Sequence, residues 1–215
     1  MLKFVYIADP MCAWCYGFAP ELKALLGAHP DATVEVIVGG LRAYNQTPFT
    51  SESRAQTKGY WGQVAATCAE HNLKFDSSAL DAPNFIYNTE PACRAVVAVR
   101  QSNHPAIAAR ALDMFHALQV AFYTFGRDIT QDYVIADVAA SMGMDGSAFL
   151  QAWQSEQLLQ MTRNDFLAVQ ELQVHGFPFL AIDVAGKLVV IARGYEKSAT
   201  LVERVKYVSM AEVKN

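Results

Sequence analysis

The sequence predicts an α/β protein in which an all-helical segment interrupts a small mixed sheet. Two runs of β-branched and aromatic residues flank a helical segment near the start of the chain, and two more such runs lie together near its end. The long stretch between them has helical periodicity and almost no strand signal. Strands at both ends of a chain with helices between them predict one sheet with an inserted helical domain.

The first predicted unit is a strand, a helix and a second strand. Residues 4–8 and 33–38 have the composition of strands, and the apolar positions of residues 15–27 recur at helical spacing. A helix of this length between two strands predicts a parallel βαβ unit with a right-handed crossover.

The second predicted unit is a hairpin followed by a helix. Residues 179–184 and 187–192 have the composition of strands, and Ala185 and Gly186 separate them. A short turn that contains glycine predicts an antiparallel hairpin. The helical pattern of residues 198–208 predicts a final helix.

We place the inserted helical domain at residues 46–164, so that the sheet-bearing domain is discontinuous and comprises residues 1–45 and 165–215. Thr89 and Pro91 are typical of a helix start, since a capping residue precedes a proline in the first turn. The predicted helices of the insertion span residues 53–72, 92–102, 105–125 and 130–142, and a short and a longer helix follow within residues 145–173. We expect the aromatic side chains Tyr60, Trp61 and Trp153 of these helices to belong to the core.

The composition is that of a folded chain without a strongly charged surface. Of the 215 residues, 53% are hydrophobic and 18% are charged, and the net charge is −4, which excludes an intrinsically disordered protein. Lysine and arginine form no cluster, so we expect neither a nucleic-acid binder nor a membrane-surface binder. Residues 105–125 carry a polar stripe, which is typical of an amphipathic helix rather than a membrane span. The first residues lack the apolar segment of a signal peptide, so we expect a cytoplasmic location.

A pair of closely spaced cysteines, Cys12 and Cys15, lies between the first predicted strand and the helix that follows it. Residues three apart in a first helical turn have Cα atoms roughly 5–5.5 Å apart, a separation that a disulfide spans with little strain. At the cap position, free backbone N–H groups and the helix dipole favour the thiolate of Cys12, which makes it the attacking nucleophile. Cys15 would be shielded one turn deeper and would resolve a mixed disulfide.

Zinc ligation is the structural alternative for this pair. The other two cysteines, Cys68 and Cys93, are distant in the sequence and form no second Cys-x-x-Cys motif, so we predict no metal site. Each falls on a predicted helix among apolar neighbours, where buried free cysteine is a common small core residue.

Three segments carry a resemblance to a known family. Residues 9–20, with the sequence DPMCAWCYGFAP, resemble the active-site segment of the DsbA-like branch of the thioredoxin superfamily, particularly its cytosolic FrnE-like and bacterial protein-disulfide-isomerase-like members. Residues 174–179, VHGFPF, are similar to the cis-proline loop of that family, and Gly39-Gly40 matches the exit into its helical domain. Pro20 stands where thioredoxin-like proteins carry a proline that kinks the active-site helix. The resemblance implies a thioredoxin fold with an inserted all-α helical domain.

This resemblance implies a thiol–disulfide oxidoreductase or isomerase that acts on thiols and disulfides of proteins or peptides. Cys12 and Cys15 would be the catalytic pair, and a cis bond before Pro178 would place the backbone of Phe177 where it pairs with an extended substrate segment. The cysteine pair is itself the redox centre, so no dissociable cofactor is needed, and glutathione stays open as a co-substrate.

The same resemblance identifies other residues near the cleft. We expect Trp14 to form an apolar wall together with Phe177, and Met11 to line the cleft rim. His175, three residues before Pro178, would add positive charge near Cys12 when it is protonated.

Two departures from the family pattern affect the redox chemistry. Tyr6 stands six residues before the first cysteine, where many thioredoxin-like proteins have a buried acid, so proton transfer from Cys15 would need Asp9, water or the substrate. The residues between the cysteines are Ala13 and Trp14, whereas DsbA has Pro-His there. Because neither carries a charge that stabilises the thiolate, we expect a less oxidising couple than that of DsbA.

Two other functions stay open. One is a glutathione-dependent isomerase or transferase of the 2-hydroxychromene-2-carboxylate isomerase type, although those relatives have serine in place of Cys12 and lack the second cysteine. The other is a non-catalytic binding module that uses the helical cleft as an adaptor surface. The oligomeric state is not predicted.

Overall fold

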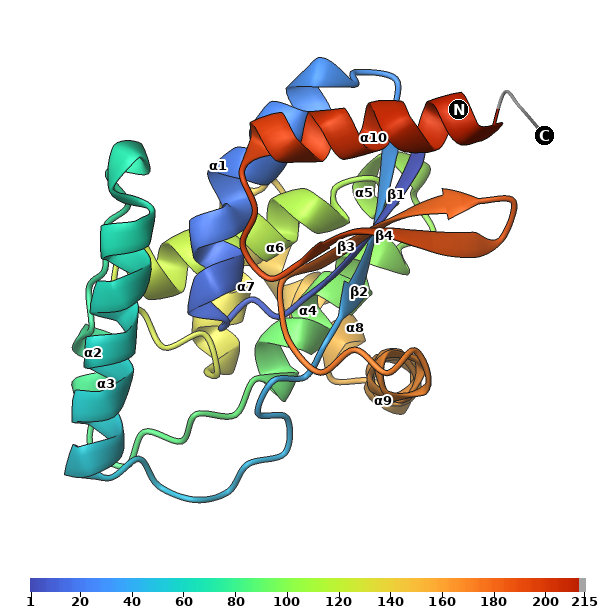
Figure 1. Cartoon of the computed structure of the whole chain (residues 1–215). Helices are drawn as coiled ribbons and strands as arrows, with labels where there is room; N and C mark the ends of the chain where they lie inside the picture. Colours follow the sequence, from blue (N-terminus) through green and yellow to red (C-terminus); the bar gives the residue numbers. More distant parts are fainter. Residues whose placement is uncertain (213–215) are drawn as a thin grey trace.

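The computed structural model describes residues 1–212 and contains a four-stranded sheet with the strand order β2-β1-β3-β4 (Figure 1). β1 pairs in parallel with β2 and antiparallel with β3, and β3 pairs antiparallel with β4. The strands are β1 (Lys3–Ala8), β2 (Thr33–Val38), β3 (Phe179–Val184) and β4 (Lys187–Arg193). The predicted βαβ unit and hairpin are therefore confirmed, and each strand boundary falls within one residue of its predicted place.

The turn of the hairpin depends on a left-handed backbone. Ala185 and Gly186 have φ angles of 49° and 83°, as both central residues of a type I′ turn require. Oδ1 of Asp183 accepts a hydrogen bond from the Gly186 N–H at 2.8 Å. The twist of this turn matches the twist of the two strands, so it holds their register.

Helices lie on both faces of the sheet. In Figure 1, α1 and α10 lie together on one side, and α9 lies on the other side near the end of β2. These three helices are α1 (Ala13–Ala28), α9 (Glu156–Glu171) and α10 (Ser198–Glu212). Between β2 and α9 the chain forms α2 (Ser51–Thr67), η1 (Ala69–His71), α3 (Ser78–Asp81), α4 (Glu90–Arg100), α5 (Pro105–Ala108), α6 (Ala111–Gln119), η2 (Val120–Thr124), α7 (Asp132–Ser141) and α8 (Gly146–Trp153). The predicted domain boundary at residue 165 falls within α9, and the division into two domains stays a prediction.

The pleat of β1 divides the core into two parts. Phe4 and Tyr6 point into the larger cluster, which α1, α10 and the helices of the insertion complete. Val5 and Ile7 point to the opposite face, where Val169 of α9 packs on them. Both faces of β1 are covered, and β1 is therefore buried in the middle of the molecule.

The prediction of one continuous helix over residues 105–125 is wrong. α5 and α6 are separate, because the backbone at Arg110 leaves the helical conformation with φ −95° and ψ 17°. The guanidinium of Arg110 donates to the carbonyl of Met142 at 2.8 Å, so a contact with the end of α7 holds this break. The last part of the segment is a π-helical turn, η2, that buries Phe122 and Tyr123. None of the helices in the described part of the chain is long and apolar enough to cross a membrane.

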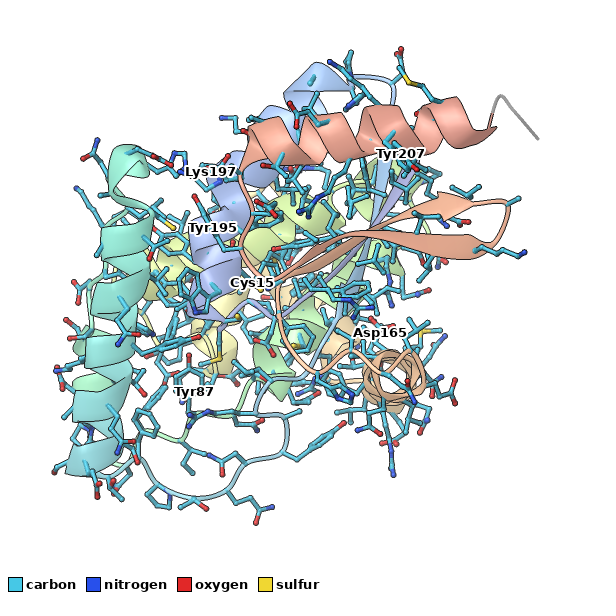
Figure 2. The ribbon with its side chains drawn as sticks, viewed as in Figure 1. Cys15, Tyr87, Asp165, Tyr195, Lys197 and Tyr207 are labelled. Carbon is cyan, nitrogen blue, oxygen red and sulfur yellow. The ribbon has the colours of Figure 1, made fainter. Side chains whose placement is uncertain are left out.

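Side chains satisfy the outer edge of β2. Nη1 of Arg100, on α4, donates to the carbonyl of Val36 at 2.6 Å, and Oδ2 of Asp165, on α9, accepts from the Val38 N–H at 3.0 Å. The two side chains also pair with each other at 2.7 and 2.8 Å. The bidentate pair thus occupies backbone groups that another strand would otherwise pair with, and it fixes α9 beside β2 (Figure 2).

We predict that Asp165→Ala lowers the free energy of unfolding by about 2–4 kcal/mol, because it leaves the partly buried Arg100 guanidinium without its carboxylate and the Val38 N–H without an acceptor. Urea unfolding followed by circular dichroism measures the change. Asp137→Ala is the matched control, since Asp137 pairs with Arg127 on the surface and its loss should cost less than about 1 kcal/mol. Equal losses in the two variants would contradict the importance of the edge contact.

Candidate active site

Cys12 caps the N-terminus of α1, at the point where the turn after β1 ends. Its N–H donates to the carbonyl of Asp9 at 3.0 Å, and its φ and ψ of −87° and 115° are those of a cap residue. Its thiol makes no capping hydrogen bond, so the free N–H groups of the first helical turn stay beside the sulfur. The N-terminus of α1 therefore offers a positive electrostatic environment to a thiolate at Cys12.

The loop before β3 faces this thiol. Sγ of Cys12 lies 3.7 Å from the carbonyl oxygen of Phe177, and the Phe177–Pro178 peptide bond is cis, the isomer that the sequence resemblance implies. The carbonyl of Pro178 accepts from the Gly194 N–H at 2.7 Å, which ties the loop to the end of β4. The backbone of the loop and the first cysteine are thus brought together from opposite ends of the chain.

A glycine makes this approach feasible. The ring of Phe177 lies on Gly39, and a Cβ atom there would come within 2.1 Å of the ring. Only a residue without a side chain leaves room for the ring in this place. Gly39, at the exit of β2, is therefore part of the site, because it sets the position of the cis-proline loop.

The carboxylate of Asp9 is fully buried beside the cysteine motif. Its Oδ1 accepts from the Met11 N–H at 2.8 Å and its Oδ2 from the Leu41 N–H at 2.6 Å. The thiol of Cys93, on α4, lies 3.5 Å from the same Oδ2. Burial raises the pKa of Asp9, and its hydrogen bonds, including one from Thr89, oppose that rise. One side chain thus fixes the cysteine turn, the exit from β2 and α4.

Cys15 lies in the first turn of α1 (Figure 2). Its side chain is fully buried. Burial raises the pKa of its thiol well above the usual range, and the neighbouring Cys12 raises it further. Burial is also the largest cause that raises the pKa of Tyr6, and negative charge on the two cysteines raises it further. Tyr6 is a neutral phenol at this depth, so it cannot accept the proton of Cys15.

A cavity of about 490 Å³ opens beside Cys12, between α2 and the cis-proline loop. Its lining includes Met11, Cys12 and Phe177 together with Arg42, Tyr60 and Tyr87. The guanidinium of Arg42 lies over the ring of Tyr87 at 5.1 Å. Within the described residues no carboxylate pairs with this guanidinium. The other residues that line the cavity carry no charge.

The prediction that Tyr60 belongs to the core is wrong, whereas Trp61 and Trp153 are buried as predicted. Tyr60 is 45% exposed and lines the cavity. Its ring lies 6.2 Å from that of Trp14, which also contacts Tyr195 at 6.0 Å. Helical spacing alone cannot show that α2 stands away from its neighbours here and leaves this face open.

The structure separates the other predicted site residues. Met11 lies at the cavity, and Trp14 packs between Tyr60 and Tyr195 beside it. His175 lines a second cavity on the far side of Phe177 rather than the one that contains Cys12. Arg42 and Tyr87 were missed, because they follow no motif and reach the site through loop conformations.

The remaining cysteines are buried and unpaired, as predicted. Cys68 packs on α1 so closely that a Cβ atom on Gly17 would lie 2.9 Å from its sulfur. Cys93 contacts Asp9 below the cysteine motif. Within the described residues all four cysteines are free thiols.

A second buried carboxylate, Glu21, holds the middle of α1. It accepts from the Ser198 N–H at 2.7 Å and the Tyr195 hydroxyl at 3.0 Å, and it lies 2.9 Å from Nε2 of His71. Burial acts to raise its pKa, but these hydrogen bonds outweigh burial and lower the pKa to about 2. Glu21 thus joins α1 to η1 and to the start of α10.

The same place holds three side chains of metal-ligand type. The ligand atoms of Glu21, Glu70 and His71 lie within 4.8 Å of one another, which the sequence spacing did not indicate. Lys197 contacts Glu70 and lies 3.7 Å from Glu21, so an ammonium group already balances the negative charge there. We assign this cluster a structural role.

A sheet of this strand order, with a cis-proline loop facing a cysteine at the start of a helix, defines a thioredoxin-like protein. The model of the DSBA-like thioredoxin domain family matches residues 5–206, and the chain belongs to this family. No curated protein matches the chain.

Solved structures agree with this membership. A candidate protein disulfide isomerase from Nitrosomonas europaea is 31% identical, with 98% of both chains covered and a TM-score of 0.86. The cytosolic disulfide reductase DsbM from Pseudomonas aeruginosa is 23% identical over 99% of this chain and 98% of that chain, with a TM-score of 0.71, and it has also been solved with GSH. A 2-hydroxychromene-2-carboxylate isomerase is 15% identical over 99% of this chain and 95% of that chain, with a TM-score of 0.60. At these identities, the last two structures establish that they share their fold with this chain.

The lowered pKa of Glu21 predicts a pH dependence of stability. The carboxylate contributes fully above its ordinary pKa of 4.5, and this contribution is lost as the pH falls from about 4.5 through about 2. Glu21→Gln should therefore be less stable than the wild type at pH 7, and its unfolding free energy should fall less between pH 4.5 and pH 2. Urea unfolding across this range measures the slope. Glu203→Gln, at an exposed position of α10, is the control that should keep the wild-type slope.

Proposed function

We propose that this protein is a thiol–disulfide oxidoreductase or isomerase whose redox centre is the pair of Cys12 and Cys15. The observation that carries the proposal is the position of Cys12, which caps α1 with a free thiol 3.7 Å from the Phe177 carbonyl. A nucleophilic sulfur at a helix N-terminus beside an unpaired loop backbone suits attack on a disulfide that is presented by an extended segment.

The proposed reaction has two exchange steps. The thiolate of Cys12 attacks one sulfur of a substrate disulfide, and the other substrate sulfur leaves as a thiolate and takes up a proton. Cys15 then loses its proton and attacks Sγ of Cys12, which releases the second substrate thiol and forms the Cys12–Cys15 disulfide. The substrate gains two electrons and the enzyme loses them. The reverse sequence oxidises a dithiol. If another thiolate of the substrate attacks the mixed disulfide instead of Cys15, a new substrate disulfide forms and Cys12 leaves as a thiolate, which gives isomerisation.

The second step needs a place for the proton of Cys15. Tyr6 is excluded, because it is a buried neutral phenol. The leaving thiolate of the substrate is the direct acceptor, since it forms beside Cys12 and its own protonation completes its release. Asp9 assists as a positioning residue, because its carboxylate holds the Met11 N–H and thereby the turn that carries Cys12.

The substrates that we propose are thiols and disulfides of proteins or peptides, with glutathione as a co-substrate. The cavity beside Cys12 supports glutathione, because it has the volume for a small thiol and offers Arg42 to a carboxylate. The structure of DsbM from Pseudomonas aeruginosa, a reductase with the same fold as this chain, has been solved with GSH. No dissociable cofactor enters the proposed reaction. The cytosolic relative also supports a cytoplasmic location, where disulfide exchange with glutathione takes place.

The cysteine pair favours this function over the two other functions. The isomerases of the 2-hydroxychromene-2-carboxylate type have a serine where this chain has Cys12, and they lack a second cysteine, so an intact pair points to redox exchange. A non-catalytic adaptor gives no reason for a free thiol at the helix cap. The substitutions below separate these functions.

Cys12→Ser should abolish the reduction of a disulfide substrate, because no nucleophile remains at the helix cap. Cys15→Ser should instead accumulate a mixed disulfide with the substrate, because Cys12 still attacks and nothing resolves the intermediate. Turnover assays and mass spectrometry of the trapped species measure both results. Cys68→Ala is the control and should keep turnover, since this buried cysteine packs on α1 away from the reacting sulfur atoms. Full activity of Cys12→Ser would refute the proposal.

The reduction potential of the couple should be more negative than about −120 mV, the value of DsbA. The residues between the cysteines, Ala13 and Trp14, carry no charge that would stabilise the thiolate of the reduced form. Equilibration with glutathione buffers, followed by the fluorescence of the adjacent Trp14, measures the potential. If no disulfide formed at any glutathione poise, the redox function would be refuted.

A further inference from the structure

Three depressions follow one another along the surface beside the cis-proline loop. The cavity at Cys12 shares Leu41 and Phe177 with a second cavity of about 440 Å³. The second cavity shares Tyr44 and Arg163 with a third of about 420 Å³ on α9. We call the second and third cavities together the α9 groove. The α9 groove and the cavity of Cys12 meet at Phe177, which lines both.

The α9 groove has apolar side chains in its floor and on its rim. Val169 and Val174 form part of its floor, and these two residues also pack on the buried face of β1. Leu41, Tyr44 and Leu167 line its rim and are 44%, 53% and 46% exposed. Large exposed apolar side chains that gather around one depression indicate a binding surface.

The charges of the groove are unbalanced. Arg163 lines both of its cavities, and Glu156 lines the third cavity only. Among residues 1–210, whose side chains the structure describes, no ion pair engages Arg163, whereas Arg94 and Arg100 of the neighbouring α4 are paired with carboxylates. At the other end of the surface, Arg42 lines the cavity of Cys12 without an acidic partner in the described residues. A chain with net charge −4 thus presents free guanidinium groups on both sides of Phe177.

We propose that the α9 groove binds the polypeptide segment that flanks the reacting cysteine of an acidic protein substrate. This inference rests on the proposed function and names the substrate class for the same site. The substrate cysteine lies at Cys12, its backbone crosses the loop at Phe177, and an apolar side chain one or two residues away enters the second cavity. A glutamate or aspartate beyond it pairs with Arg163.

The shape of the surface supports a polypeptide rather than a small disulfide. A small thiol fills the cavity at Cys12 and does not reach α9, because Phe177 stands between the two. An extended chain rises about 3.3 Å per residue and presents alternate side chains to one face, so consecutive cavities can receive side chains of one segment. The free guanidinium of Arg163 selects for a carboxylate at that end.

The test uses two disulfide-linked peptide dimers that differ in charge. Both peptides have a leucine next to their single cysteine, and beyond it one carries two glutamates and the other two lysines. The rate of single-turnover reduction by the reduced protein is followed by the fluorescence of Trp14. The wild type should reduce the glutamate peptide at least about threefold faster than the lysine peptide, and 1 M salt should remove the difference.

Substitutions locate the preference. Arg163→Glu should reverse the order of the two peptides, and Arg163→Ala should abolish it. Arg127→Ala is the matched control, because Arg127 is a surface arginine on the loop before α7, and it should keep the wild-type preference. Reduction of hydroxyethyl disulfide, which carries no charge, should be the same in all four proteins.

The outcomes separate this inference from the proposed function. Equal rates for the two peptides, together with normal reduction of hydroxyethyl disulfide, would overturn the inference and leave the oxidoreductase in place. Failure to reduce any of the three disulfides would overturn both. A dimer of the wild type that Arg163→Glu dissociates, measured by light scattering, would show that a second copy of the chain occupies the groove and would also overturn the inference.

Discussion

The carboxylate of Asp9 is the contact on which the rest of the site depends. It is fully buried, and its two oxygens bind the backbone of the cysteine turn and the backbone at the exit of β2, at 2.8 and 2.6 Å. A buried carboxylate without partners would cost several kcal/mol, so these N–H groups and the carboxylate require one another. The turn that carries Cys12 and the loop that carries Leu41 are therefore held as one unit, although they are distant in the sequence.

The position of the cis-proline loop follows from this unit. Once the exit of β2 is fixed, Gly39 offers a flat backbone surface on which the ring of Phe177 rests. The same contact brings the Phe177 carbonyl to the thiol of Cys12 and separates the cavity of Cys12 from the α9 groove. The pair of Arg100 and Asp165 holds α9, which forms the wall of the groove, at the outer edge of β2.

The parts of the fold that local patterns determine could be predicted from the sequence, and the parts that depend on distant contacts could not. The strands, the hairpin and the helix after Cys12 follow from runs of β-branched and aromatic residues, a glycine turn and helical spacing, and the structure has them in those places. The break at Arg110 depends on a bond to Met142, which has no local signal. The cavity at Cys12 needs Arg42 and Tyr60, and the cluster at Glu21 needs His71, and each of these side chains arrives from a different element. The cysteine pair could be found because its two members are three residues apart on one helix.

The exchange of an acid for a tyrosine at position 6 changes where the charge of the site is located. A phenol in β1 stays neutral beneath Cys15, because burial raises its pKa. The buried carboxylate of this chain is instead at position 9, where two backbone N–H groups hold it in one orientation. A carboxylate held in this way cannot swing toward the sulfur of Cys15, so it acts through the geometry and the field of the turn and not as a mobile base. In the reaction that we propose, the proton of Cys15 leaves with the departing thiol, which couples the rate of the second step to the basicity of the substrate.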